Sequence, residues 1–392
     1  AVLWFSPSIC SRMADSVCEL TTQFLVCVSS TTQNSSPNPM TQRVSMHTAV
    51  RLLITLPTLV FLFFSTPDAA FADEDDASKH TVKAEVALHG GKYLTAAEEF
   101  VKAAELSDSA EVARKATKLS FDLGFNDLAL EAAERWVELE PESDEALIHL
   151  AQLQLRKGDV RASRRSFSRL IERGDEPADE RLFALMQFIS QENAEDADKL
   201  MRALAKPYDD SALAQYSAAA MALQANDTEF AMEASQRAIE LDPDWLKPKL
   251  LYGRTMLVAG NSEEAIDYVA RLIGDDPDPD PDARMELALM YMTAGEPDYA
   301  LSQVNQVLLE RAGRTDALRM MAIINFNQGN LDAAWDDFED LLQSGDHTTD
   351  ALFYLAQISE VRGEYDDAIQ LYSRVRSGSN AIPAQRRAAQ IR

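Results

Sequence analysis

The fold is decided by one phrase that recurs along the chain. Residues 363–372 read "GEYDDAIQLY", 329–338 read "GNLDAAWDDF", 260–269 read "GNSEEAIDYV" and 91–100 read "GKYLTAAEEF". Each phrase opens on glycine, has alanine five residues later and ends on a bulky apolar residue. A phrase that returns in this way indicates an internal structural repeat rather than a set of unrelated domains.

The opening position of the phrase recurs with a period of 33 to 35 residues. Glycine occupies seven of the nine opening positions, and Glu192 and Asn226 occupy the other two. The seven glycines are Gly91, Gly124, Gly158, Gly260, Gly295, Gly329 and Gly363. Nine units in register predict a linear array in which each unit contacts its neighbours.

Small residues mark a fixed place after each opening position. Five residues after it stand Ala96, Ala129, Ser163, Ala197, Ala231, Ala265, Ala300, Ala334 and Ala368. Apolar spacings of three, four and seven residues within each half are helical. The turn residues between the halves therefore predict two helices per unit, which approach closely where neither has a large side chain.

This unit resembles the tetratricopeptide repeat, with "AMEASQRAIELDPDW" (231–245) as an especially close match. The resemblance implies an all-α fold, a right-handed superhelical solenoid of about nine helix-turn-helix units over residues 73–382. Residues 383–392 read as the start of a further, truncated repeat. The overall run is also similar to bacterial envelope adaptors that contain this repeat.

The body of the chain is strongly acidic. The formal net charge is −27, and residues 1–72 contain three basic and three acidic residues, so the excess lies on residues 73–392. Such a surface repels phosphate backbones and anionic lipid head groups, so we expect no nucleic-acid partner. Acidity that only keeps a long helical array soluble is the simpler interpretation.

The N-terminal part has the pattern of a processing signal. Residues 40–72 combine a basic start (Arg43, Arg51), the apolar run "LLITLPTLVFLFF" (52–64) and the small-x-small site that ends at Ala72. Residues 1–39 show no usable periodicity and are interpreted as an unstructured prefix that a gene model added. We expect an exported, periplasmic or envelope-associated protein, with an uncleaved membrane anchor as the alternative.

No motif for catalysis, a cofactor or a metal ion occurs. The five histidines are scattered, and the three cysteines all precede residue 28. The segment "DDPDPDPD" (275–282) has carboxylates for calcium, but its prolines favour a stiff connection between repeats. The sequence therefore predicts a non-enzymatic protein with no cofactor.

The remaining candidate site is the concave groove that the first helices of such repeats line. The resemblance places ten residues of units six to eight on it: Lys247, Leu250, Arg254, Leu257, Met285, Leu289, Met292, Arg319, Ile323 and Phe326. Apolar and methionine-rich side chains beside two arginines suit a peptide or a helix. Ordinary packing within the helices is the alternative.

We therefore expect a scaffold that binds a protein or peptide partner. The similarity to envelope adaptors implies a link between an envelope protease and cell-wall enzymes. Two alternatives stay open: a periplasmic arm of an outer-membrane polysaccharide secretion protein, and a regulatory arm of an enzyme that lies beyond Arg392. Oligomeric state has no signal in the sequence, and membrane contact is expected only through an uncleaved anchor.

Overall fold

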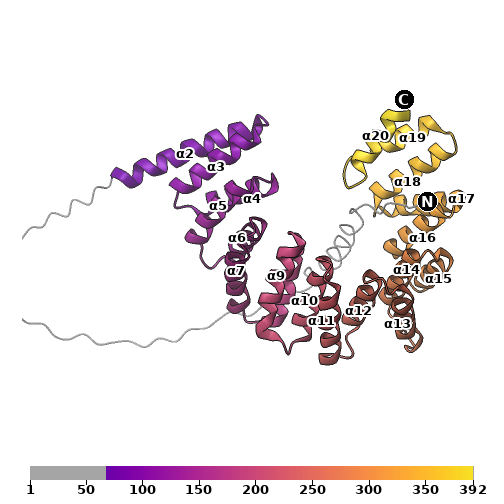
Figure 1. The fold of residues 1–392 in the computed structure, drawn as a ribbon. Helices are drawn as coiled ribbons and strands as arrows, with labels where there is room; N and C mark the ends of the chain where they lie inside the picture. Colours follow the sequence, from indigo (N-terminus) through magenta and orange to yellow (C-terminus); the bar gives the residue numbers. More distant parts are fainter. Residues whose placement is uncertain (1–67, 392) are drawn as a thin grey trace, which may run out of the picture. The chain divides into compact units, whose positions relative to one another are not determined.

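The computed structural model describes residues 68–391, and all of its regular structure is helical (Figure 1). The predicted prefix 1–39, the predicted signal up to residue 67 and Arg392 lie outside the described residues. Nineteen α-helices and one 3-10 turn follow one another in two compact units. The fold is thus an all-helical solenoid of tetratricopeptide type.

The first unit ends at Leu204, within its last helix. Its helices are α2 (Asp68–His89), α3 (Tyr93–Leu106), α4 (Ala110–Asp122), α5 (Asn126–Leu139), α6 (Asp144–Arg156), α7 (Val160–Arg173), α8 (Ala178–Ile189) and α9 (Ala194–Ala205). Consecutive helices pack as the hairpins α2/α3, α4/α5 and α6/α7, and α8/α9 is the fourth pair in the chain.

The second unit begins at Ala205. After the 3-10 turn η1 (Lys206–Tyr208), its helices are α10 (Ala212–Gln224), α11 (Thr228–Leu241), α12 (Leu246–Val258), α13 (Ser262–Gly274), α14 (Pro281–Ala294), α15 (Pro297–Glu310), α16 (Thr315–Asn327), α17 (Leu331–Ser344), α18 (Thr348–Val361), α19 (Tyr365–Arg374) and α20 (Ala381–Ile391). They form five hairpins, and α20 packs against α19. That the repeat continues after α20 stays a prediction.

The turn inside each hairpin explains the recurring glycine. All seven opening glycines have a positive φ, for example 81° at Gly363, and Asn226 shares this backbone with φ 63°. The residue after each one closes the helix through an N–H bond to a carbonyl five positions back, as in Glu364 N to Ser359 O at 2.8 Å. Glycine adopts this left-handed backbone without strain, and asparagine is the next most tolerant residue.

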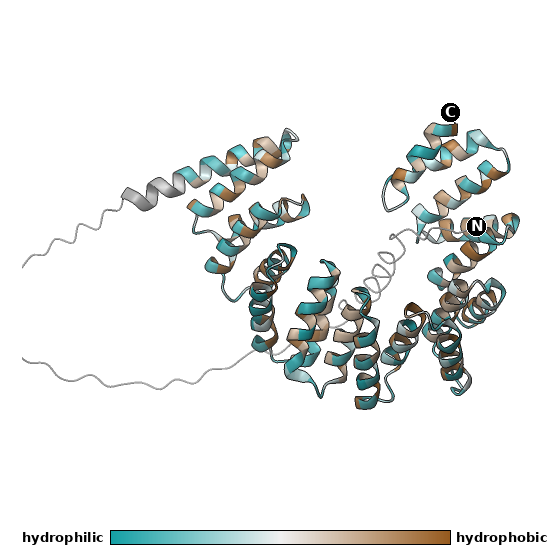
Figure 2. Cartoon of the chain, in the orientation of Figure 1, coloured by the Kyte–Doolittle hydropathy of each residue, from teal (hydrophilic) through white to brown (hydrophobic). Residues whose placement is uncertain are grey.

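Close approach of the two helices explains the recurring small residues. The nine residues five positions after each opening residue, from Ala96 to Ala368, are all buried with no exposed surface. Bulky residues four positions further on, such as Phe100 and Phe338, fill the space towards the next hairpin and are equally buried. Figure 2 shows the resulting pattern, in which apolar residues occupy part of the circumference of many helices and polar residues the rest.

None of the helices in the described part of the chain is both long and apolar enough to cross a membrane.

Candidate functional site

The ten predicted residues lie on the first helices of three successive hairpins in the second unit. Lys247, Leu250, Arg254 and Leu257 belong to α12. The others follow on α14 (Met285, Leu289, Met292) and α16 (Arg319, Ile323, Phe326). Spacings of three, four and seven residues keep each set on one helix face. We refer to the first helix of a hairpin as helix A and call these ten residues the helix-A surface.

The helix-A surface is partly open. Lys247 is exposed, and the other nine residues are half-buried. None of the ten is fully buried, although neighbours on the same helices, such as Leu287 and Ile324, are. Part of each of the nine side chains therefore stays accessible.

Most of its apolar side chains also pack against the core. Leu250 and Leu257 contact the cluster around Val269, and Met285 and Met292 contact the cluster around Val304. Ile323 and Phe326 pack in the same way beside Phe338, where the Phe326 ring also meets the Tyr354 ring at 5.2 Å. These side chains thus pack against the core and at the same time stay partly accessible. The binding role of the ten residues stays a prediction.

The two arginines of the helix-A surface are each held by a carboxylate from the next hairpin. Arg254 Nε lies 2.8 Å from Glu286 Oε1, and its second nitrogen also contacts the Glu286 carboxylate. Arg319 Nε lies 2.7 Å from Asp350 Oδ2. Burial lowers the pKa of Arg254, but Glu286 and Tyr216 together raise it by more, so the guanidinium stays charged. Both guanidinium groups are therefore already paired with a carboxylate of this chain.

Sequence reasoning missed the carboxylate partners. Glu286 follows Arg254 by 32 residues, and Asp350 follows Arg319 by 31. The Asp350 carboxylate continues the chain of contacts, because its Oδ1 accepts a hydrogen bond from Asn380 Nδ2 at 2.7 Å. A search for opposite charges close to one repeat length apart would have found both pairs.

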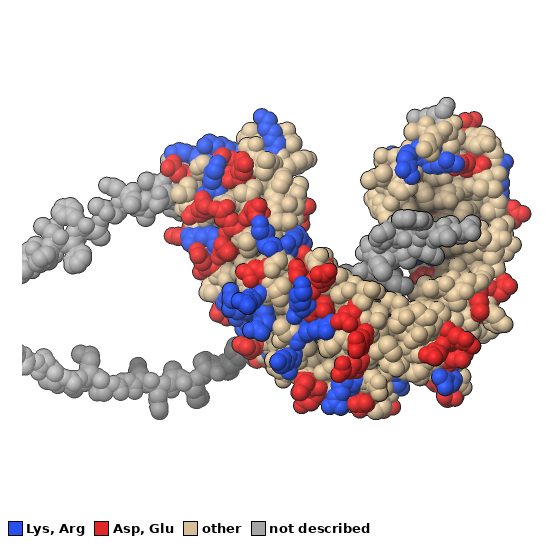
Figure 3. Space-filling model, in the orientation of Figure 1, with Lys and Arg blue, Asp and Glu red and all other residues tan. Residues whose placement is uncertain are grey.

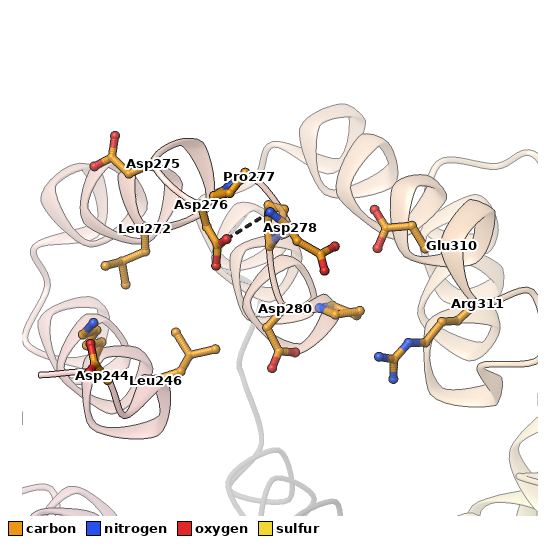
Figure 4. A pocket seen from close by; sticks show the side chains of 13 residues that line it. Asp244, Leu246, Leu272, Asp275, Asp276, Pro277, Asp278, Asp280, Glu310 and Arg311 are labelled. Atoms are coloured by element: carbon orange, nitrogen blue, oxygen red, sulfur yellow. Dashed lines mark hydrogen bonds between the residues drawn. The ribbon is translucent and has the colours of Figure 1, made fainter. Parts of the chain in front are cut away.

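A separate pocket lies at the junction of α13 and α14 (Figure 4). It has a volume of about 810 Å³ and contains none of the ten predicted residues. Its lining consists of Asp244, Leu246, Lys249, Leu272, Asp275, Asp276, Pro277, Asp278, Pro279, Asp280, Pro281, Glu310 and Arg311. The acidic segment predicted as a stiff connection thus joins two hairpins and also borders a cavity.

Two of the five aspartates that line this pocket accept hydrogen bonds from the local backbone. Asp276 Oδ1 accepts the Asp278 N–H at 3.0 Å, and Asp280 Oδ1 caps α14 through the Asp282 N–H at 2.8 Å. Within residues 68–391, no group of three or more histidine, cysteine, aspartate or glutamate side chains is arranged to hold a metal ion.

Comparisons with known proteins agree with the repeat. Two family models, both described as tetratricopeptide repeat, match this chain, one at residues 118–179 and 319–382 and the other at 222–285. A comparison with curated proteins found no match to this chain.

Three of the solved structures that match this chain are the following. Yeast Tom70 is 13% identical, with 81% of this chain and 96% of that chain covered and a TM-score of 0.45. A tetratricopeptide repeat protein from Parabacteroides merdae is 17% identical, with 64% and 99% covered and a TM-score of 0.43. YrrB, described as a repeat protein with an unusual peptide-binding site, is 17% identical, with 45% and 90% covered and a TM-score of 0.34.

Proposed function

Because this chain is a tetratricopeptide repeat protein, we propose that it is a non-catalytic scaffold that binds a protein or peptide segment on its helix-A surface. The observation that supports this role is the partial exposure of nine aligned side chains on α12, α14 and α16. Leucine, methionine and phenylalanine there offer an adaptable apolar strip.

The ligand that suits this surface is an amphipathic segment. An apolar stripe with its own i, i+4 spacing would cover Leu289 and Met292, and its polar rim would meet Lys247 and the two arginine–carboxylate pairs. Because Arg254 and Arg319 are already neutralised, the contact depends on apolar burial more than on net charge.

Selection of peptides from a displayed library on the full chain tests this role. Peptides that bind the helix-A surface lose at least about tenfold in affinity for Leu289→Glu, since one buried leucine contributes about 1.5–3 kcal/mol. The matched control is Leu309→Glu on α15, where the leucine is 78% exposed. If the selected peptides bind Leu289→Glu as tightly as the unchanged chain, the helix-A surface is not the binding site.

Export and an envelope role belong to the same proposal. They are supported by the signal-like pattern of residues 40–72 and by the similarity to envelope adaptors, which suggests a scaffold that links a protease to cell-wall enzymes. Fusion of residues 40–76 to alkaline phosphatase, which is active only after export, tests whether this segment directs export. An inactive fusion would exclude export, and a smaller product that disappears in Ala70→Arg/Ala72→Arg would show cleavage.

A further inference from the structure

Helix α7 carries a cluster of positive charge on an otherwise acidic protein. Its sequence "VRASRRSFSRLIER" contains five arginines and one glutamate. Arg161, Arg164, Arg165 and Arg169 are exposed, and we call these four residues the arginine stripe. In Figure 3, blue side chains gather over the part of the surface where α7 lies in Figure 1.

The structure of the first unit does not need this charge. The opposite face of α7 supplies the core contacts, with Ser163 and Phe167 buried. Arg169 and Arg173 donate to the Pro141 carbonyl, and Arg173 also lies 3.5 Å from Glu142. Arg161, Arg164 and Arg165 make no hydrogen bond or ion pair with the described residues. Like charges four residues apart weaken a helix, so the stripe is costly without an external partner.

Three features point to the chemistry of that partner. Arginine presents a planar fork that binds a carboxylate through two hydrogen bonds. Arg161, Arg165 and Arg169 follow one another at four-residue intervals, which on a helix is a rise of about 6 Å. Alternate residues of an extended chain lie about 6.5 Å apart, so an extended segment with an acid at every second residue offers one carboxylate per arginine.

The surroundings of the stripe limit the length of the ligand. Asp159 caps the N-terminal end of α7, and Asp127 holds Lys157 close by. At the C-terminal end, Glu142 and Asp144 lie 3.5 and 3.6 Å from Arg173. A membrane or a nucleic-acid duplex would bring many phosphates over these carboxylates as well, whereas a single peptide strand passes between them.

We propose that the arginine stripe of α7 binds a short, extended acidic segment of a partner protein, with carboxylates at alternate positions. This surface belongs to the second helix of its hairpin and shares no residue with the helix-A surface. The chain is therefore a scaffold with two docking surfaces of different chemistry, one apolar and one cationic.

The test uses the full chain and a fluorescent peptide of three aspartate–threonine pairs, with anisotropy as the readout. R161E/R164E/R165E is expected to bind about tenfold more weakly, since three exposed ion pairs of modest strength are lost. R271E/R376E/R386E makes the same charge change at three exposed arginines elsewhere and is expected to bind within about twofold of the unchanged chain. Leu289→Glu is expected to have no effect, which separates this site from the helix-A surface.

Four results would overturn the proposal. They are no measurable binding of the peptide, an equal loss in the control variant, tighter stripe-dependent binding of a DNA duplex or of phosphatidylserine vesicles, and self-association of the chain that R161E/R164E/R165E abolishes. A peptide with its three aspartates in one block is expected to bind more weakly than the alternating one, and equal binding would remove the spacing argument. Far-ultraviolet circular dichroism checks that every variant is folded.

Discussion

At the scale of single residues, close packing decides which side chains the hairpins tolerate. Gly253 on α12 faces α13, and a β-carbon placed on it would lie 2.7 Å from Val269 Cγ2 and 3.3 Å from Met290 Cε. Val269 is fully buried in a cluster with Leu287 and Met290, so moving it would disturb these contacts. Glycine at this position is therefore a packing requirement and not a source of chain flexibility.

Gly253→Ala is expected to destabilise the second unit by about 1–3 kcal/mol, because the added methyl group overpacks a tight contact. Gly274→Ala is the matched control, since a β-carbon there meets nothing within 4 Å. It is expected to be neutral or slightly stabilising, because alanine is the better helix former. Urea unfolding of both variants makes the comparison, and equal stabilities would contradict the packing argument.

Asp337 on α17 provides a second test at this scale. Burial raises the pKa of its carboxyl, the Asn325 hydrogen bond at 2.8 Å opposes the rise, and Asp340 and Asp336 add to it. A raised folded-state pKa means that the stability this group contributes is present below about pH 4 and is lost as the pH rises through the folded value.

Asp337→Asn is therefore expected to raise the free energy of unfolding at pH 7 and to leave it unchanged near pH 3. The measurement is urea unfolding at both pH values. Glu339→Gln removes the same charge from an exposed side chain on the same helix and serves as the control. A gain of equal size at both pH values would show that Asp337 does not titrate as argued.

At the scale of helices, ion pairs join several hairpins to the next one in the chain. They differ in burial: the Glu286 side chain that holds Arg254 is 8% exposed, whereas the Asp332 side chain that holds Arg362 is 99% exposed. Breaking a buried pair by removing one partner strongly destabilises the fold, since water does not replace the lost partner. An exposed pair contributes little to stability, because water solvates both charges when the pair is broken.

Glu286→Gln is expected to cost about 3 kcal/mol of stability, because it leaves the Arg254 guanidinium charged and incompletely paired. Asp332→Asn, at the exposed pair, is expected to cost at most about 1 kcal/mol. Thermal unfolding followed by circular dichroism compares the two. A larger loss in Asp332→Asn would reverse the assignment of which contacts connect the hairpins.

At the scale of the whole molecule, the acidic excess is the dominant feature. A formal net charge of −27 produces self-repulsion that opposes the folded chain, and dissolved salt screens it with a Debye length of about 10 Å at 0.1 M. Salt also weakens the exposed ion pairs, but each of these contributes little.

The thermal midpoint is therefore expected to rise by several degrees between about 10 mM and 300 mM sodium chloride. Differential scanning calorimetry measures it. R161E/R164E/R165E adds negative charge and is expected to show a steeper rise. A midpoint that falls with added salt would mean that ion pairs outweigh the global repulsion.

The repeat itself followed from the sequence alone, because its determinants are local. A glycine or asparagine at a left-handed turn and a small residue five positions later both act within one hairpin of about 34 residues. Gly363, Asn226 and Ala368 illustrate this, since each has the backbone or burial that its position predicts. The ten residues of the helix-A surface were chosen through the resemblance to the tetratricopeptide repeat, and their binding role stays a prediction.

Contacts between hairpins were decided only by the tertiary structure. Glu192 occupies an opening position but does not share the positive φ of the others, and its buried carboxylate pairs with Arg156 of the preceding hairpin. The partner of Arg254, the acidic pocket and the unpaired arginines of α7 belong to the same class. Each depends on whether side chains of one hairpin contact side chains of another. Local periodicity along the sequence does not predict such contacts.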